Sequence, residues 1–181
     1  MARNIYGLDL GSYEIKVYDK KKDTIWKEKD ALALTDKKEI FAVGDEAYEM
    51  YEKTPPFLDV VFPMKQGVIS RFTDMQFLLQ NLLKKDRQFV RGSEYVIAVP
   101  TDVTEVEKKA FFDLVIHSNA KAKEVNIVER AIADAVGLNL DVQNTKGLFI
   151  ANFGGETTEL SVLAGGGMVL NRLLKTGGRT F

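Results

Sequence analysis

Apolar and polar positions alternate in three short segments over the first thirty residues. Residues 5–10 form a mainly apolar run that ends at Gly11 and Ser12, residues 13–18 follow at once, and residues 23–29 come after a turn of three lysines. Alternation with a period of two, bounded by glycine or charged turns, predicts β-strands. Since short turns join antiparallel neighbours, we predict that the chain opens with three consecutive antiparallel strands.

The next segment, residues 31–66, has a less regular pattern. It predicts a strand at residues 41–43, a short helix over residues 45–51, and an irregular connection where Thr54 is followed by two prolines. Proline fits neither the interior of a helix nor a central strand. We interpret residues 31–66 as a small subdomain inserted into a larger one.

Helices and strands then alternate. Thr73 with Gln76, and Thr104 with Glu107, have the spacing of capping boxes, and each pair precedes an apolar stripe of helical period. The predicted helices end near Lys85 and Asn119. Residues 95–99 are a continuous apolar run closed by proline, which predicts a strand buried on both faces. Residues 124–128 predict another strand, and residues 130–136 a short helix stopped by a glycine.

The opening pattern begins again at residues 148–158, with an apolar run, an Asx residue, a glycine turn and hydroxyls. Residues 159–163 and 168–174 predict the two strands that follow. The order β-β-β, insertion, α-β-α-β-α, and then strands again is an internal repeat. It predicts an α/β, ribonuclease-H-like domain over residues 1–146, with the insertion at about 31–66. Residues 147–181 would open a second similar domain, and two such domains in tandem form the actin-like ATPase fold.

The two glycine turns carry the candidate chemistry. Glycine permits a positive φ and brings backbone N–H groups close to an anion, and hydroxyls add donors. We therefore expect both turns to contact one phosphate chain from opposite sides. The candidate residues are Asp9, Gly11, Ser12 and Tyr13 in the first turn, and Asn152, Gly154, Gly155, Thr157 and Thr158 in the second. Ordinary hairpin turns are the alternative, and for Asn152 the alternative is a structural Asx turn.

Composition narrows the classes of function. The 181 residues carry a net charge of -1 with 28% charged residues, so there is no basic excess to suggest nucleic acid as a partner. The absence of cysteine excludes disulfides and thiolate metal sites, and fits a cytoplasmic protein. No signal peptide is visible at the N-terminus, and no apolar run approaches the ~20 residues of a membrane span.

Four stretches resemble the bacterial actin homologues of the rod shape-determining MreB type. They are residues 7–12, residues 43–50 with the following Thr54-Pro55, residues 62–69 and residues 99–107, within a resemblance that covers nearly the whole chain. The two middle stretches distinguish this family from the heat-shock chaperone ATPases, which share only the hairpins. The resemblance implies ATP and Mg²⁺ between two domains, self-association into filaments beneath the cell membrane, and a role in cell shape.

Three positions depart from the family pattern. Asn152 stands where the family has aspartate, Glu156 where it has glycine, and Arg130, after Glu129, where it has the glutamate thought to position the attacking water. Arginine cannot accept a proton from water, and Asn152 lacks the charge that would hold a hydrated Mg²⁺ beside Asp9. Glu156 places a carboxylate in the turn that would hold phosphates. At ~4 Å from one phosphate charge, its repulsion costs about 1 kcal/mol in water and about 4 kcal/mol at a dielectric of 20. We expect hydrolysis to suffer more than binding, unless a loop shift brings Glu129 to the water.

Two further readings stay open for the function. The chain can be a competent ATPase of the chaperone-like branch that remodels a client protein, or a scaffold that binds no nucleotide. Residues 86–92 are the candidate membrane contact, because Phe89 and Val90 lie between two arginines. Burial of Phe89 against the core is the competing interpretation.

The last residues, 176–181, resemble the turn before a long helix of the family's second domain. We therefore expect this sequence to be a fragment without the part that holds adenosine in the family. The expected result is weak binding of ATP and Mg²⁺ by the 181 residues alone.

Overall fold

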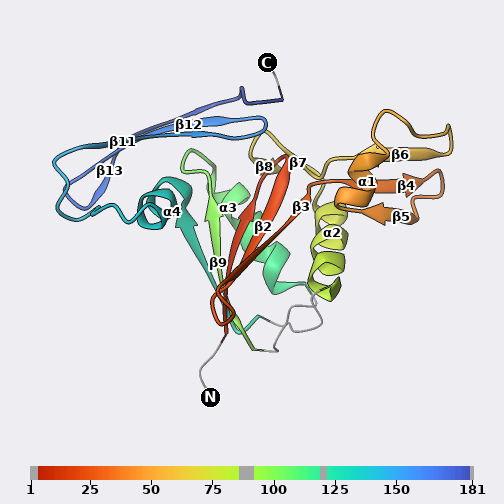
Figure 1. The fold of residues 1–181 in the computed structure, drawn as a ribbon, viewed down its shortest axis with the longest axis horizontal. Coiled ribbons are helices and arrows are strands. Elements are labelled where there is room, and N and C mark those ends of the chain that lie inside the picture. Colours follow the sequence, from red (N-terminus) through yellow and green to blue (C-terminus); the bar gives the residue numbers. More distant parts are fainter. Residues whose placement is uncertain (1–3, 86–91, 119–121, 180–181) are drawn as a thin grey trace.

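The structure is a computed structural model that describes residues 4–85, 92–118 and 122–179. A five-stranded sheet of order β10-β9-β1-β2-β3 forms its centre (Figure 1). Its strands are β1 (Ile5–Leu10), β2 (Glu14–Asp19), β3 (Thr24–Lys29), β9 (Glu94–Val99) and β10 (Glu124–Glu129). The first three are antiparallel, and β9 and β10 run parallel to β1. The predicted opening of three antiparallel strands followed by alternating helices and parallel strands is confirmed.

The main core lies on one face of this sheet, under helices α2 (Phe72–Lys85) and α3 (Glu105–Ile116). Alternate residues of β9 point into it, so Tyr95 is fully buried while Val96 and Ala98 on the other face are only half-buried. The prediction that this strand is buried on both faces is therefore wrong. An unbroken apolar run fits either case, because apolar residues are also common on partly exposed faces.

The two helices begin differently. Thr104 caps α3 as predicted, since its Oγ1 accepts from Glu107 N–H at 3.2 Å and Glu107 Oε2 accepts from Thr104 N–H at 2.7 Å. Helix α2 begins at Phe72, where the carbonyl of Arg71 accepts the first helical bond, from Met75 N–H at 2.9 Å.

The predicted capping box at Thr73 is thus wrong, because Thr73 already lies inside α2. The Arg71 side chain binds Asp74 across this turn. Gln76, the expected partner of Thr73, donates its amide to the carbonyl of His117 at 3.3 Å. The two residues of the expected pair therefore do not form the start of this helix.

Residues 31–66 contain more structure than the pattern predicted. The predicted strand and helix are confirmed as β5 (Ile40–Val43) and α1 (Asp45–Glu49). Two further strands, β4 (Leu32–Thr35) and β6 (Leu58–Val61), complete a sheet of order β5-β4-β6. A short hairpin, β7 (Met64–Lys65) and β8 (Val68–Ile69), leads back to α2. Strand β4 escaped prediction because three consecutive residues are buried, which removes the period of two.

The second sheet consists of β11 (Leu148–Phe153), β12 (Thr158–Ala164) and β13 (Gly167–Leu174), all antiparallel. The strands expected at 159–163 and 168–174 are confirmed. Helix α4 (Arg130–Gly137) packs beneath this sheet through Ala135, Ile150 and Leu163. Figure 1 shows the sheet (blue) at the opposite side of the molecule from the inserted subdomain, with the central sheet between them.

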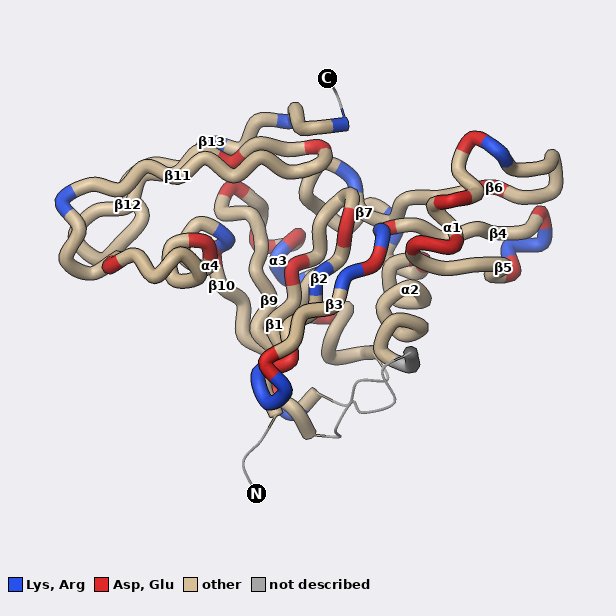
Figure 2. The backbone as a smooth tube through the Cα atoms, in the orientation of Figure 1, with Lys and Arg blue, Asp and Glu red and all other residues tan. Residues whose placement is uncertain are grey.

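Charged positions of both signs are spread over the elements (Figure 2). The lysine-rich turn between β2 and β3 lies at the end of the central sheet that faces away from the second sheet. None of the described helices is both long and apolar enough to cross a membrane.

Candidate functional site

The two glycine turns meet in one cavity of about 810 Å³. Its walls also include the β7–β8 turn, the start of α4 and residues 178–179. Of the residues predicted from sequence, those that line the cavity are Asp9, Gly11, Ser12, Tyr13, Arg130, Asn152, Gly154, Gly155 and Thr157. Residues from both ends of the chain are therefore brought together.

Two candidates do not line this cavity. Thr158 is buried and donates its hydroxyl to the carbonyl of Thr176 at 2.8 Å. Glu129, the last residue of β10, lines a separate depression between β10 and α3. In this arrangement Glu129 is not at the position where it would activate a water beside the phosphate turns.

The glycines of the two turns allow the backbone to pack closely. None of Gly11, Gly154 and Gly155 has a positive φ, so that part of the expectation is wrong. A Cβ on Gly155 would lie 2.6 Å from the Cβ of Tyr13, and one on Gly11 would lie 2.7 Å from the carbonyl oxygen of Glu14. Glycine is needed because the two turns approach each other closely and each folds tightly on itself.

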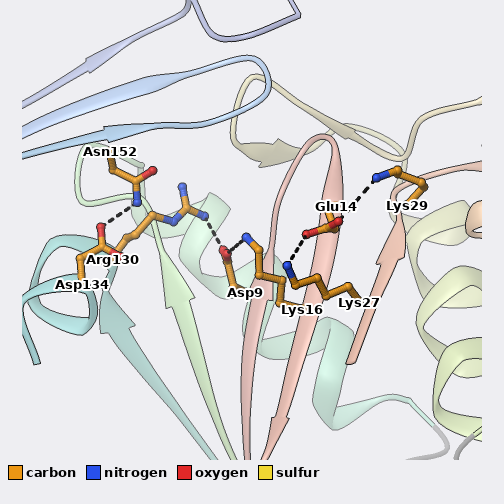
Figure 3. A network of polar contacts seen from close by, with 8 residues as sticks. All are labelled: Asp9, Glu14, Lys16, Lys27, Lys29, Arg130, Asp134 and Asn152. Atoms are coloured by element: carbon orange, nitrogen blue, oxygen red, sulfur yellow. Dashed lines mark hydrogen bonds and ion pairs between the residues drawn. The ribbon is translucent and has the colours of Figure 1, made fainter. Parts of the chain in front are cut away.

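Asp9 is held by two cations (Figure 3). Lys16 Nζ lies 2.9 Å from Oδ2, and Arg130 Nη2 lies 3.3 Å from Oδ1. Lys16 is the cross-strand neighbour of Asp9 in the β1–β2 hairpin, so the hairpin register was the signal that could have identified it. The Arg130 side chain is 11% exposed, and its Nε is buried without a hydrogen-bond partner among the described residues.

Asn152 binds a carboxylate that the sequence did not suggest. It lies inside β11, so the Asx-turn alternative is wrong, and its Nδ2 donates to Asp134 Oδ2 at 2.7 Å. Burial raises the pKa of Asp134, which the hydrogen bond from Asn152 and the charge of Arg130 partly offset. Asp134 lies one helical turn after Arg130 in α4, and that spacing is the signal that could have found it.

The carboxylate of Glu156 is held by the first part of the chain. Its Oε2 accepts from the backbone N–H of Gln66 at 2.7 Å, and Arg179 Nη1 lies 3.8 Å from Oε1. The neighbouring N–H of Gly67 donates to Ser12 Oγ at 3.0 Å. One β-turn between β7 and β8 thus donates to both phosphate turns, and no local pattern pointed to it.

Glu159 makes a second connection between the two sheets. It is 3% exposed, and its Oε1 accepts from Thr101 N–H at 3.0 Å and from Asn171 Nδ2 at 2.8 Å. Its other oxygen is buried without a partner among the described residues. Thr101 lies two residues after the end of β9, so Glu159 links the second sheet to the carboxyl end of this strand of the first sheet.

The side chains in the cavity fit a phosphate chain better than a divalent cation. Lys16, Arg130 and Arg179 offer cationic donors to phosphate oxygens. Mg²⁺ prefers carboxylate and water oxygens, but both oxygens of Asp9 already face cations, and Asn152 is neutral. Among the described residues there is no group of three or more histidine, cysteine, aspartate or glutamate side chains able to hold a metal ion. The residues present do not fit the Mg²⁺ site that the resemblance implied.

Sequence comparison gives a family for nearly the whole chain. The family model described as MreB/Mbl protein matches residues 3–181. The cell shape-determining protein MreB of Escherichia coli K12 is 31% identical over 189 aligned positions, which cover 100% of this chain and 54% of that protein. The cell shape-determining protein Mbl of Bacillus subtilis 168 is 30% identical, with 99% and 54% covered. The chain thus spans about half the length of these curated relatives.

Solved structures give the same result for the fold. The crystal structure of MreB5 of Spiroplasma citri bound to ADP matches with a TM-score of 0.90 and 28% identity, over 99% of this chain and 54% of that one. The same protein bound to AMPPNP matches equally well, with a TM-score of 0.90. A MamK double helical filament, 22% identical with a TM-score of 0.78, shares the fold over 98% of this chain and 56% of its own. The predicted actin-like fold is confirmed, and the chain belongs to the MreB/Mbl family.

Proposed function

We propose that this chain carries the phosphate-binding part of an MreB-type filament subunit that acts in cell-shape determination. The observation that carries the proposal is the meeting of two glycine turns across one cavity, whose lining includes the cationic side chains of Lys16, Arg130 and Arg179. The relatives titled as cell shape-determining proteins, and the Spiroplasma structures with ADP and AMPPNP, support the same reading. The chaperone-like alternative loses its support, because the family match is to MreB/Mbl.

The proposal includes weak hydrolysis. Water attacks a phosphate efficiently when a side chain accepts its proton, and Arg130 in the water-positioning place only donates. Glu129, the nearest candidate in sequence, lines a different depression. The cavity would therefore bind and orient a phosphate chain with little turnover.

Filament formation, a location at the cytoplasmic membrane face, and membrane contact through Phe89 and Val90 belong to this proposal. Those two residues lie outside the residues that the structure describes. The division of the chain into residues 1–146 and 147–181 also stays a prediction. The MamK filament supports assembly only as a property of a protein with the same fold.

The test is a calorimetric titration of the 181-residue chain with ATP and with inorganic tripolyphosphate. Tripolyphosphate needs no adenosine pocket, so it reports on the two turns alone. We expect binding by the unaltered chain and a loss of about tenfold or more in Gly155→Ala, because a Cβ there would meet Tyr13 at 2.6 Å and push the turns apart. Gly137→Ala is the matched control, since a Cβ at that position meets no heavy atom within 4 Å.

A folded chain that binds neither compound would contradict the proposal and favour the scaffold. The hydroxyl of Ser12 accepts from the N–H of Gly67, and its own O–H is still a donor that could bind a phosphate oxygen. Steady release of phosphate from bound ATP would contradict the weak hydrolysis and leave the binding function standing.

A further inference from the structure

The acidic side chains of the cavity outnumber the basic ones, and how each is paired decides what the cavity attracts. The charged lining residues are Lys16, Arg130 and Arg179 on one side, and Asp9, Glu14, Asp134, Glu156 and Glu159 on the other. Five acids and three bases would repel an anion if all of them were free.

Four of the five acids have hydrogen-bond or ion-pair partners other than Lys16 and Arg130. Lys27 and Lys29 lie 3.7 Å and 3.5 Å from the two oxygens of Glu14 (Figure 3). Asp134 accepts from Asn152, Glu156 from the N–H of Gln66, and Glu159 from the N–H of Thr101. The Asp9 cluster, defined as Asp9, Lys16 and Arg130, lines the same cavity and has two positive charges against one negative charge.

Arg130 has donor capacity to spare. A guanidinium carries five N–H donors in a planar fork, and Arg130 donates to Asp9 Oδ1 at 3.3 Å through Nη2. The Arg130 side chain is 11% exposed, and its Nε is buried without a hydrogen-bond partner among the described residues. Buried donors are normally satisfied, and Arg130 lines the cavity, so its unused N–H donors favour an anionic ligand there.

We infer that Lys16 and Arg130 take the place of the divalent cation, so that this site binds the phosphate chain of a nucleotide in its metal-free form. The inference rests on the proposed function. A guanidinium and an ammonium neutralise phosphate oxygens by charge-assisted hydrogen bonds. A metal ion near Asp9 would meet two fixed positive charges whose repulsion opposes its binding.

The experiment compares tripolyphosphate binding to the 181-residue chain in excess EDTA and in excess Mg²⁺. We expect dissociation constants that agree within about threefold in the two conditions. Arg130→Gln should weaken binding in EDTA by about tenfold or more, because it removes the charge and the fork that bind phosphate. Arg172→Gln, at an exposed position of β13 outside the cavity lining, is the matched control and should bind as the unaltered chain does.

A double variant, Arg130→Glu with Asn152→Asp, restores the acidic groups of the family pattern and should bind tripolyphosphate only with Mg²⁺. Binding of the unaltered chain only with Mg²⁺ would overturn the inference and leave the proposed function intact. Unchanged binding by a folded Arg130→Gln variant in EDTA would overturn the role of Arg130. Failure to bind in both conditions would instead overturn the proposed function.

Discussion

Burial changes the pKa of single carboxyl groups in this molecule, and Asp30 is the main example. Asp30 is fully buried. Its Oδ2 accepts from Met64 N–H at 2.8 Å, and its Oδ1 has no hydrogen-bond partner among the described residues. Burial raises the pKa of Asp30 to about 8, against the opposing effect of the Met64 hydrogen bond. Asp30 directly follows β3, and its own N–H donates to the carbonyl of Tyr13 in the first phosphate turn. The Asp30 backbone therefore contacts the first phosphate turn, while its carboxyl binds the start of β7.

Asp30→Asn should reduce the pH dependence of stability. Below the unfolded pKa of about 4, both states hold the proton; as the pH rises toward about 8 the unfolded state loses it first, so the free energy of unfolding falls by at most about 1.4 kcal/mol per pH unit. Asparagine keeps an acceptor and does not titrate. Melting temperatures at several values between about pH 5 and about pH 8 should favour the variant increasingly as the pH rises. The exposed Asp36→Asn is the control, and a profile for Asp30→Asn parallel to that of the unaltered chain would contradict the prediction.

At the scale of elements, helix ends distinguish local sequence signals from tertiary ones. The box of Thr104 and Glu107 satisfies backbone N–H groups at the start of α3 reciprocally. Thr73 and Gln76 have the same spacing but form no capping box, because α2 starts earlier and Gln76 donates to the carbonyl of His117 at the end of α3. A capping motif therefore identifies a helix start only where no tertiary contact competes for its side chains.

Thr104→Ala should lower the free energy of unfolding by about 1 kcal/mol, since one donor at the start of α3 loses its acceptor. Thr73→Ala is matched in chemistry and lies inside α2 near its start, so we expect a change of less than about half that size. Urea denaturation followed by circular dichroism measures both. Equal losses in the two variants would contradict the assignment of α3 alone as the capped helix.

At the scale of the whole molecule, side-chain and backbone hydrogen bonds join the second sheet to the rest across the cavity. Glu156 binds the N–H of Gln66, Glu159 binds the N–H of Thr101, and Arg179 Nη1 donates to the carbonyl of Ser12 at 3.4 Å. These contacts hold the two phosphate turns at a fixed separation. The carboxylate that departs from the family pattern in the second turn is thus part of this connection.

Glu156→Gly, which restores the family's residue, should free the Gln66 amide. We expect its hydrogen exchange to accelerate by about tenfold or more, because the acceptor at 2.7 Å is removed. Glu156→Gln keeps an acceptor oxygen and is the control that should retain most of the protection. Peptide-resolved mass spectrometry of the β7–β8 hairpin provides the measurement, and unchanged exchange in the glycine variant would show that Glu156 does not hold this turn.

The sequence by itself determined the features that depend on residues close together in the chain. The period of two in the opening strands, the glycine turns and their repetition 143 positions later at Gly154 all follow from local patterns, and they sufficed for the actin-like fold. Local patterns failed where tertiary burial changes them, as in β4, or where a distant contact replaces a local one, as at Thr73.

The long-range partners of the charged side chains were decided only by the tertiary structure. Arg130 and Asp9 are 121 positions apart, and Glu156 and Gln66 are 90 apart. Strand order and the packing of α4 under the second sheet bring such residues together, and no periodicity encodes that arrangement. The sequence therefore named most residues of the candidate site, while the structure decided that Arg130 and Lys16 share Asp9, because a charge takes the partner that folding places beside it.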